Sequence, residues 1–237
     1  MRRLIVGLAM LAAASAAPAS VPAAPKLTIV ISVDQLTPEL LDEYRPQLHG
    51  GLAKVAGAPV TAGVAASGQK VSVGGSASAV DRTADQRWFW NGRGFGTDVP
   101  GARAPRSVPL ANAGVRKLIA TAEAALVPPP YCQAKAKPGG TRFARAAGDV
   151  AAFARSPSLD GATLALAAGL IQDLRLGRDA APDVLTIDLA ATAQVAQTYG
   201  AGSEEMCLDL FSLDRELGDF LRAIDRMRIN YAVELKR

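Results

Sequence analysis

The stretch LTIVISVDQLTPELL, residues 27–41, contains the signals that decide the fold. Residues 27–33 form a continuous apolar, β-branched run, which is typical of a strand covered on both faces in a parallel sheet. After Asp34 and a short turn, Thr37 is placed as an N-cap and Pro38 as the first helical residue, and Gly50-Gly51 is expected to end that helix. A strand, a turn and a helix in this order predict the opening unit of an α/β fold.

The remaining sequence supplies further strands and helices of the same kind. A strand over 70–73 and a hairpin around Asn91-Gly92 are expected first. Helices are expected over 115–126, 142–154, 160–176 with Asp160 as N-cap, and from a Ser203 cap to Met227. The last expected strands are 184–189 and 231–235. We therefore expect a partial, mostly parallel sheet flanked by helices, with an inserted cap-like region.

Residues 1–24 have the pattern of an export signal and spacer. Arg2 and Arg3 precede an apolar stretch over 4–14, and Ala14-Ser15-Ala16 suits cleavage. The mature chain is then expected in the periplasm or outside the cell, with no membrane attachment after cleavage. Loss of both arginines lowers the formal net charge from +4 to +2, and the basic residues are scattered, so nucleic acid is not expected as a partner.

Imidazole and thiol ligands for a metal are few in this chain. It has one histidine, His49, and two cysteines, Cys132 and Cys207, which excludes a site with two imidazoles and a zinc module built from cysteines. His49 follows a helix and is expected to face solvent or cap it. In an oxidising compartment the two cysteines form one disulfide or remain two separate buried thiols.

Asp34 is the candidate functional residue that this fold prediction provides. It follows directly after a strand of the expected parallel sheet, and ligands of open α/β sheets bind outside the carboxyl ends of the strands. A carboxylate there suits a metal or a substrate. The alternative is an aspartate that caps the turn before the helix.

Several longer stretches resemble the alkaline phosphatase superfamily, in particular its branch of secreted bacterial phosphatases and type I phosphodiesterase–nucleotide pyrophosphatases. The resemblance covers most of the mature chain and is specific in the WFWNGRGF and EEMC segments. The stretches that carry it are LTIVISVDQLTPELLDEYRPQL (27–48), TADQRWFWNGRGFGTD (83–98), YCQAK (131–135), FARSPSLDGATLALA (153–167) and TYGAGSEEMCLDLFSLDRELGDFL (198–221).

The resemblance implies a site with two zinc ions, held by aspartate and histidine at strand ends, and a threonine or serine nucleophile. It puts Asp34 at the first metal-ligand position. The other site motifs of the family are not matched in this chain. Where the family has an aspartate and a histidine after its next core strand, this chain has Ala193 and Gln197. Where the family has a phosphate-contacting Lys-Asp-Arg stretch, it has residues 76–78, Ser-Ala-Ser, and Thr61 has no matching nucleophile context.

These differences predict a shortened and catalytically degenerate relative, with no catalytic residue, no cofactor and Asp34 as the remaining metal-ligand position. The family's next Asp-His pair would follow the strand over 231–235. We divide the chain into the leader 1–24, an incomplete core of 25–69 and 183–237, and a cap-like insertion over 70–182.

Three other functions are kept open. The chain could be a weak phosphohydrolase with a reduced metal site at Asp34. It could be a non-catalytic periplasmic module that binds a phosphate-containing small molecule. It could also be a remnant without function.

Overall fold

The computed structural model describes residues 24–57 and 67–236, so the leader and Thr61 lie outside the described residues. Its strands form one six-stranded sheet in the order β4-β3-β2-β5-β1-β6. Every neighbouring pair is parallel except β3 and β4, which confirms the predicted mostly parallel α/β fold. The strands are β1 (Leu27–Val33), β2 (Lys70–Gly74), β3 (Gln86–Trp90), β4 (Phe95–Gly96), β5 (Asp183–Leu189) and β6 (Tyr231–Lys236).

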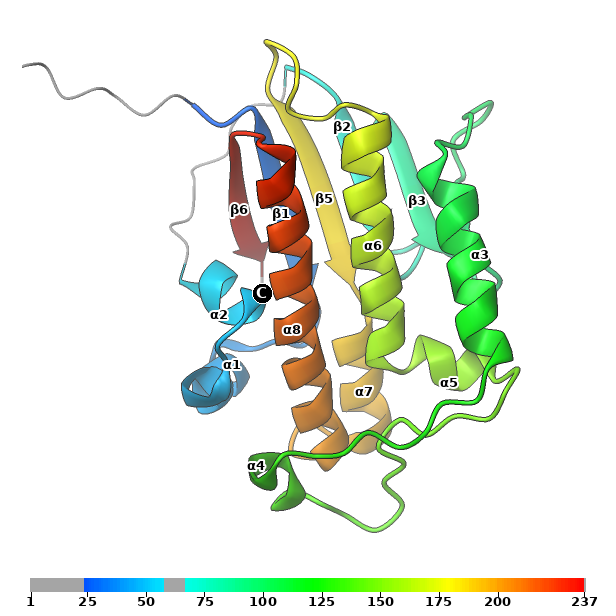
Figure 1. Ribbon diagram of the computed structural model, residues 1–237, viewed down its shortest axis with the longest axis vertical. Coiled ribbons are helices and arrows are strands. Elements are labelled where there is room, and N and C mark those ends of the chain that lie inside the picture. Colours follow the sequence, from blue (N-terminus) through cyan, green and yellow to red (C-terminus); the bar gives the residue numbers. More distant parts are fainter. Residues whose placement is uncertain (1–23, 58–66, 237) are drawn as a thin grey trace, which may run out of the picture.

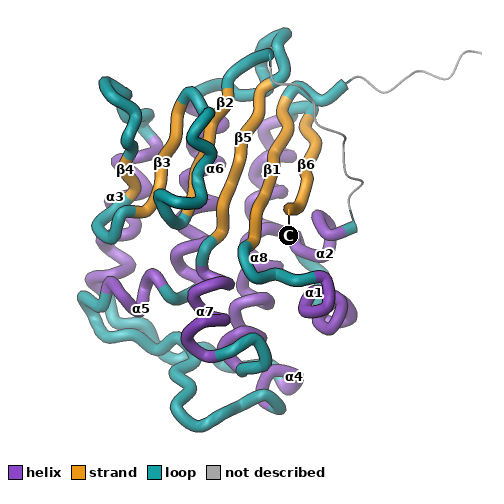
Figure 2. Tube along the Cα trace, turned by 180° about the vertical axis from the view of Figure 1, so that it is seen from behind, coloured by secondary structure: helices purple, strands orange, loops and turns teal. Residues whose placement is uncertain are grey.

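The three longest helices, α3, α6 and α8, lie side by side in front of the sheet in Figure 1, and from behind the strands face the viewer (Figure 2). A short 3-10 turn, Arg45–Gln47, follows the first helix. The helices are α1 (Pro38–Tyr44), α2 (Gly51–Ala56), α3 (Ser107–Ala120), α4 (Pro130–Gln133), α5 (Val150–Ala154), α6 (Pro157–Asp173), α7 (Ala191–Tyr199) and α8 (Glu204–Met227).

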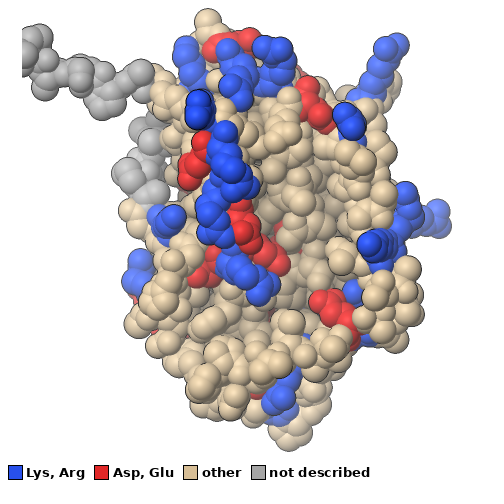
Figure 3. Space-filling view, in the orientation of Figure 1, with Lys and Arg blue, Asp and Glu red and all other residues tan. Residues whose placement is uncertain are grey.

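The core lies between the sheet, in particular its neighbouring strands β1 and β5, and this helical layer. On β1, Leu27, Ile29 and Ile31 are fully buried, and Leu185 and Ile187 on β5 are buried with them. These residues alternate along each strand, so they share the sheet face on which the helices pack. The apolar stripe of α8 closes the core, while its outer surface carries interleaved basic and acidic side chains (Figure 3).

The stretch 70–182 is expected from the sequence as a cap-like insertion. It supplies β2, β3 and β4, half of the strands of the sheet, in addition to α3 to α6. The parallel pairing of β2 with β5 connects this stretch to the strands of the core. Its expected role as a cap over a substrate remains a prediction.

Three helix boundaries differ from the sequence prediction. The helix expected over 115–126 is α3, which begins at Ser107 and ends at Ala120. Of the helix expected over 142–154, only α5 is helical, because Arg145 forms an isolated bridge with Glu123 instead. Such errors arise because alanine-rich segments carry little periodic signal to fix the ends of a helix.

Two of the predicted helix ends are also wrong. Ser156, not Asp160, is at the N-cap position of α6, because Pro157 is the first helical residue. Gly51 does not end the first helix: it begins α2, whereas α1 stops at Tyr44, ahead of the 3-10 turn that contains Pro46. The Thr37 cap is confirmed, since its side chain accepts a hydrogen bond from the Leu40 nitrogen at 3.2 Å.

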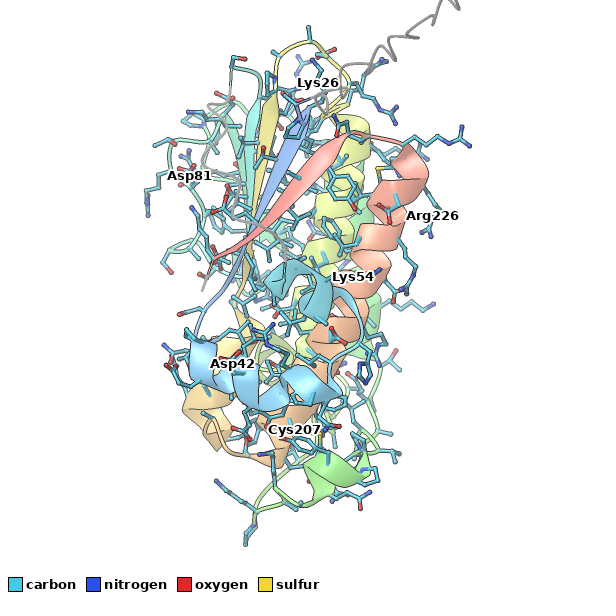
Figure 4. All side chains as sticks on the ribbon, turned by 90° about the vertical axis from the view of Figure 1, so that its left-hand side faces the viewer. Lys26, Asp42, Lys54, Asp81, Cys207 and Arg226 are labelled. Carbon is cyan, nitrogen blue, oxygen red and sulfur yellow. A yellow bond between two sulfur atoms is a disulfide. The ribbon has the colours of Figure 1, made fainter. Side chains whose placement is uncertain are left out.

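One disulfide connects Cys132 in α4 to Cys207 in α8, with the Cα atoms 5.5 Å apart. Both side chains are fully buried, and Figure 4 shows Cys207 beside α4 at one end of the molecule. The structure thus selects the disulfide from the two alternatives that the sequence left open. No helix in residues 24–57 and 67–236 combines the length and apolar character needed to cross a membrane.

Candidate functional site

A pocket of about 450 Å³ lies at the carboxyl ends of β1, β2 and β5. Asp34 lines it just after β1, Asp188 lines it from the end of β5, and Ser76 and Ser78 line it from the segment after β2. Helix α7 continues directly below β5 in Figure 2 and supplies a further wall. The sheet therefore brings to one place residues that are far apart in the sequence, at the edge where parallel sheets bind ligands.

The strand register explains why the two carboxylates are neighbours. Asp188 on β5 is paired with Ser32 on β1, and Asp34 follows the end of β1 two residues beyond Ser32, so both aspartates reach the same pocket. Asp34 is exposed, whereas Asp188 is only 8% exposed. Burial, together with the charge of Asp34, raises the pKa of Asp188 to about 6.

Helix α7 contributes Ala193, Gln194 and Gln197 to the lining of the pocket. Ala193 and Gln197 are four residues apart and so lie on one face of the helix, and both line the cavity. Two buried aspartates fix the first turn of α7. Asp160 Oδ1 accepts a hydrogen bond from the Ala191 nitrogen at 3.1 Å, and Asp209 Oδ2 accepts one from the Thr192 hydroxyl at 2.8 Å.

Burial raises the pKa of both of these aspartates. Burial raises the pKa of Asp209 to about 7, although the hydrogen bond from Thr192 opposes this shift. Burial and the nearby Asp209 hold the pKa of Asp160 well above its usual range. Their hydrogen bonds orient α7, and neither residue lines the pocket, so we assign them a positioning role.

A glycine allows the segment after β2 to approach β5 closely. The Gly75 nitrogen donates a hydrogen bond to the Asp188 carbonyl at 3.1 Å. A Cβ at Gly75 would lie 2.6 Å from the Ala190 Cβ, so a larger residue does not fit. Beyond this contact, the hydroxyls of Ser76 and Ser78 are 3.1 Å apart at the pocket wall.

The remaining wall is apolar and includes Trp90, Ala154 and Leu159. The Trp90 ring is held between Phe95 and Phe153, with ring centroids 6.1 and 5.5 Å away. These contacts fix the indole, since a packed aromatic ring has little rotational freedom. The pocket thus combines two carboxylates, neutral hydroxyls and amides, and one rigid aromatic wall.

Sequence reasoning found part of this site. Asp34 does line the pocket at the predicted strand end, while its role as a metal ligand remains a prediction. His49 lies away from it, where its backbone nitrogen donates to Asp214 at the start of α2. Asp188 was missed. The signal for it was a carboxylate inside the apolar run 184–189, because aspartate is rarely found in a buried strand.

The donor set does not fit a pair of zinc ions. A catalytic zinc uses three protein ligands, mostly imidazole, thiolate or carboxylate. Within residues 24–57 and 67–236 no group of three or more such side chains could hold a metal ion. The pocket itself offers two, Asp34 and Asp188, beside the alanine and glutamine of α7.

A second cavity, of about 580 Å³, lies between α3 and α6. Its walls are mostly small and apolar residues, among them Gly161 and Leu118. Glu216 is the acidic residue in its lining, and burial raises the pKa of this carboxyl to about 7. This cavity is larger, but it lacks the convergent polar groups of the strand-end pocket.

Two curated proteins match the sequence. Alkaline phosphatase PhoK from Sphingomonas sp is 34% identical over 197 residues, which cover 78% of this chain and 34% of PhoK. Alkaline phosphatase PhoD from Zymomonas mobilis subsp. mobilis is 34% identical over 162 residues, covering 64% of this chain and 28% of PhoD. The chain therefore spans about a third of the length of these relatives. No family model matches the chain.

A solved structure agrees with the fold. The crystal structure of wild-type alkaline phosphatase PafA superposes with a TM-score of 0.73, covering 91% of this chain and 63% of PafA. Sequence identity in that comparison is 16%, so it supports the arrangement of sheet and helices and not the chemistry of the site.

Proposed function

The chain belongs to the alkaline phosphatase superfamily, and we propose that it is an exported, catalytically degenerate member whose strand-end pocket binds a small molecule without hydrolysing phosphate esters. The match covers only about a third of each relative, so their activity is not transferred to this chain. The proposal depends on the side chains that this chain places in its own pocket.

One observation carries the proposal. Ala193 and Gln197, which stand where the resemblance implies a metal-binding aspartate and histidine, line the same pocket as Asp34. Neither a methyl group nor a primary amide replaces an ionised carboxylate or an imidazole as a zinc ligand at comparable affinity. Without the metals, the stabilisation of attacking and leaving oxygens in phosphoryl transfer has no source.

Export is supported by two features. Residues 1–24 have the pattern of a cleavable leader. The Cys132–Cys207 disulfide is of a kind that persists in oxidising compartments such as the periplasm. Cell fractionation of the native full-length product tests this part, and recovery in the cytoplasm with its leader intact would contradict it.

The test of degeneracy is an assay with aryl phosphate monoesters and diesters in zinc-supplemented buffer, with PhoK as the positive control. We expect no turnover above the buffer rate. Turnover that disappears in Asp34→Ala would refute the proposal, because it would locate hydrolysis in this pocket.

A second candidate is a weak phosphohydrolase with one metal ion at Asp34. Asp188 favours it, because it adds a second carboxylate beside Asp34. Zinc stoichiometry separates the two functions, since a tightly bound equivalent of zinc is expected only for the hydrolase.

A phosphate-containing small molecule is the ligand that the family resemblance suggests for the non-catalytic module. A rise in the melting temperature on adding inorganic phosphate or a nucleotide, without turnover, would support that ligand. The negative charge of the pocket, however, favours a different class of ligand.

A further inference from the structure

We propose that the strand-end pocket binds a small organic ammonium compound, whose protonated nitrogen is held by Asp34 and Asp188. This inference deepens the proposed function and rests on it for the location of the pocket. The first argument is charge. Among the described residues that line the cavity there are two carboxylates and no lysine or arginine, so the lining attracts cations and repels phosphate.

The second argument is that Asp188 is buried and its carboxylate has no partner among the described residues. The residue is only 8% exposed and lines the pocket, and within the described part of the chain its carboxylate makes no hydrogen bond or ion pair. A buried carboxylate without a partner is costly, and a bound cation that donates hydrogen bonds offsets that cost. Asp34 approaches from the neighbouring strand and adds a second acceptor for the same cation.

The third argument is the size and wall of the cavity. A volume of about 450 Å³ is in the range of small-molecule sites and exceeds what a single bound ion fills. Trp90 and Leu159 provide an apolar wall for a carbon skeleton, and an indole also attracts ammonium groups. The Gln197 amide and the Ser78 hydroxyl offer acceptors for further N–H or O–H groups.

Isothermal titration of the mature chain with putrescine tests the proposal, with 1,4-butanediol as the uncharged probe of the same length. We expect putrescine to bind and butanediol not to bind. Asp188→Asn removes the charge and keeps the shape, and it should weaken putrescine binding by about tenfold or more. Asp179→Asn makes the same charge change at an exposed aspartate outside the pocket and should leave binding unchanged.

A second variant covers the case in which Asp188→Asn alters folding. Gln197 is exposed at the pocket, so Gln197→Lys places a protein ammonium group there without disturbing the core and should abolish putrescine binding. Binding that survives both variants, or no binding of putrescine at millimolar concentration, would overturn the proposal. So would binding of Zn²⁺, Ca²⁺ or inorganic phosphate in a chain that does not bind putrescine. Aryl phosphate turnover is measured separately, so failure of the amine proposal and failure of the proposed function are distinguishable.

Discussion

The carboxyl group of Asp160 in α6 accepts a hydrogen bond from the backbone nitrogen of Ala191, the first residue of α7, at 3.1 Å. Both residues are buried, and the adjacent Thr192 is bonded to Asp209 of α8. The wall of the pocket is thus oriented by carboxyl groups in its supporting helices. This explains how the pocket can keep its shape with an alanine and a glutamine on α7.

Asp209 makes the stability of the fold depend on pH. Its pKa is about 7 in the folded chain against a usual value of 3.8, so between about pH 4 and pH 7 the folded chain holds more protons than the unfolded chain. The free energy of unfolding contributed by this group is therefore highest below pH 4 and falls as pH rises toward 7. A tenfold difference in proton affinity between the folded and unfolded chains corresponds to about 1.4 kcal/mol.

Asp209→Asn removes this titration and keeps the side-chain size, so we expect a flatter dependence of stability on pH. Urea unfolding at several pH values across this window measures it. Asp179→Asn, at an exposed aspartate, is the matched control and should keep the wild-type slope. If the free energy of unfolding of Asp209→Asn depends on pH as steeply as that of the wild type, the pKa of Asp209 is not raised by folding.

The contact between α2 and α8 requires a glycine at residue 51. A Cβ there would lie 2.2 Å from the backbone nitrogen of Gly218, so Gly51→Ala must push the two helices apart. We expect a loss of about 2–3 kcal/mol in the free energy of unfolding, as for other overpacked sites. Gly57→Ala is the control at the other end of α2, where the nearest atoms would be 3.7 Å away, and it should change stability by less than about 1 kcal/mol. Equal effects of the two variants in chemical denaturation would contradict this packing.

The sequence predicted those elements whose signals are local. The strand Leu27–Val33 was found with the bounds that the structure gives it, because a β-branched apolar run ends abruptly at Asp34. The start of α8 was found because Ser203 is an effective cap, accepting from the Met206 nitrogen at 3.0 Å. The start of α3 was misplaced because Pro109 and Gly114, both poor helix formers, lie ahead of the predicted start at residue 115.

The site was predicted in part for a related reason. Asp34 could be placed because a strand end is visible in the sequence. Asp188 gained its neighbour only through the parallel pairing of β1 with β5, which joins residues more than 150 positions apart. The position of Asp160 depends on tertiary contacts as well: it was expected to cap its own helix, and it holds the start of the next one instead.

The disulfide is expected to contribute much of the stability of the end of the molecule near α4. It joins residues separated by 75 positions, and closing a loop of that length in the unfolded chain corresponds to about 4 kcal/mol in the chain-entropy model. Cys132→Ser/Cys207→Ser should therefore lower the free energy of unfolding by about that amount. Reduction of the wild-type chain is the matched treatment and should reproduce the loss. If the oxidised and reduced chains unfold at the same denaturant concentration, the bond does not stabilise the fold.

Zinc affinity can be raised by restoring donors to α7. In Ala193→Asp/Gln197→His, a carboxylate and an imidazole four residues apart share the pocket face of the helix, beside Asp34. We expect zinc affinity to rise by about tenfold or more over the wild-type chain, because an imidazole and a carboxylate replace a methyl group and an amide. Competition with a chelator of known affinity measures the change, with each single variant as the control. An unchanged affinity in the double variant would show that these two positions cannot act together as ligands, and it would contradict the assignment of Ala193 and Gln197 to the metal-ligand positions.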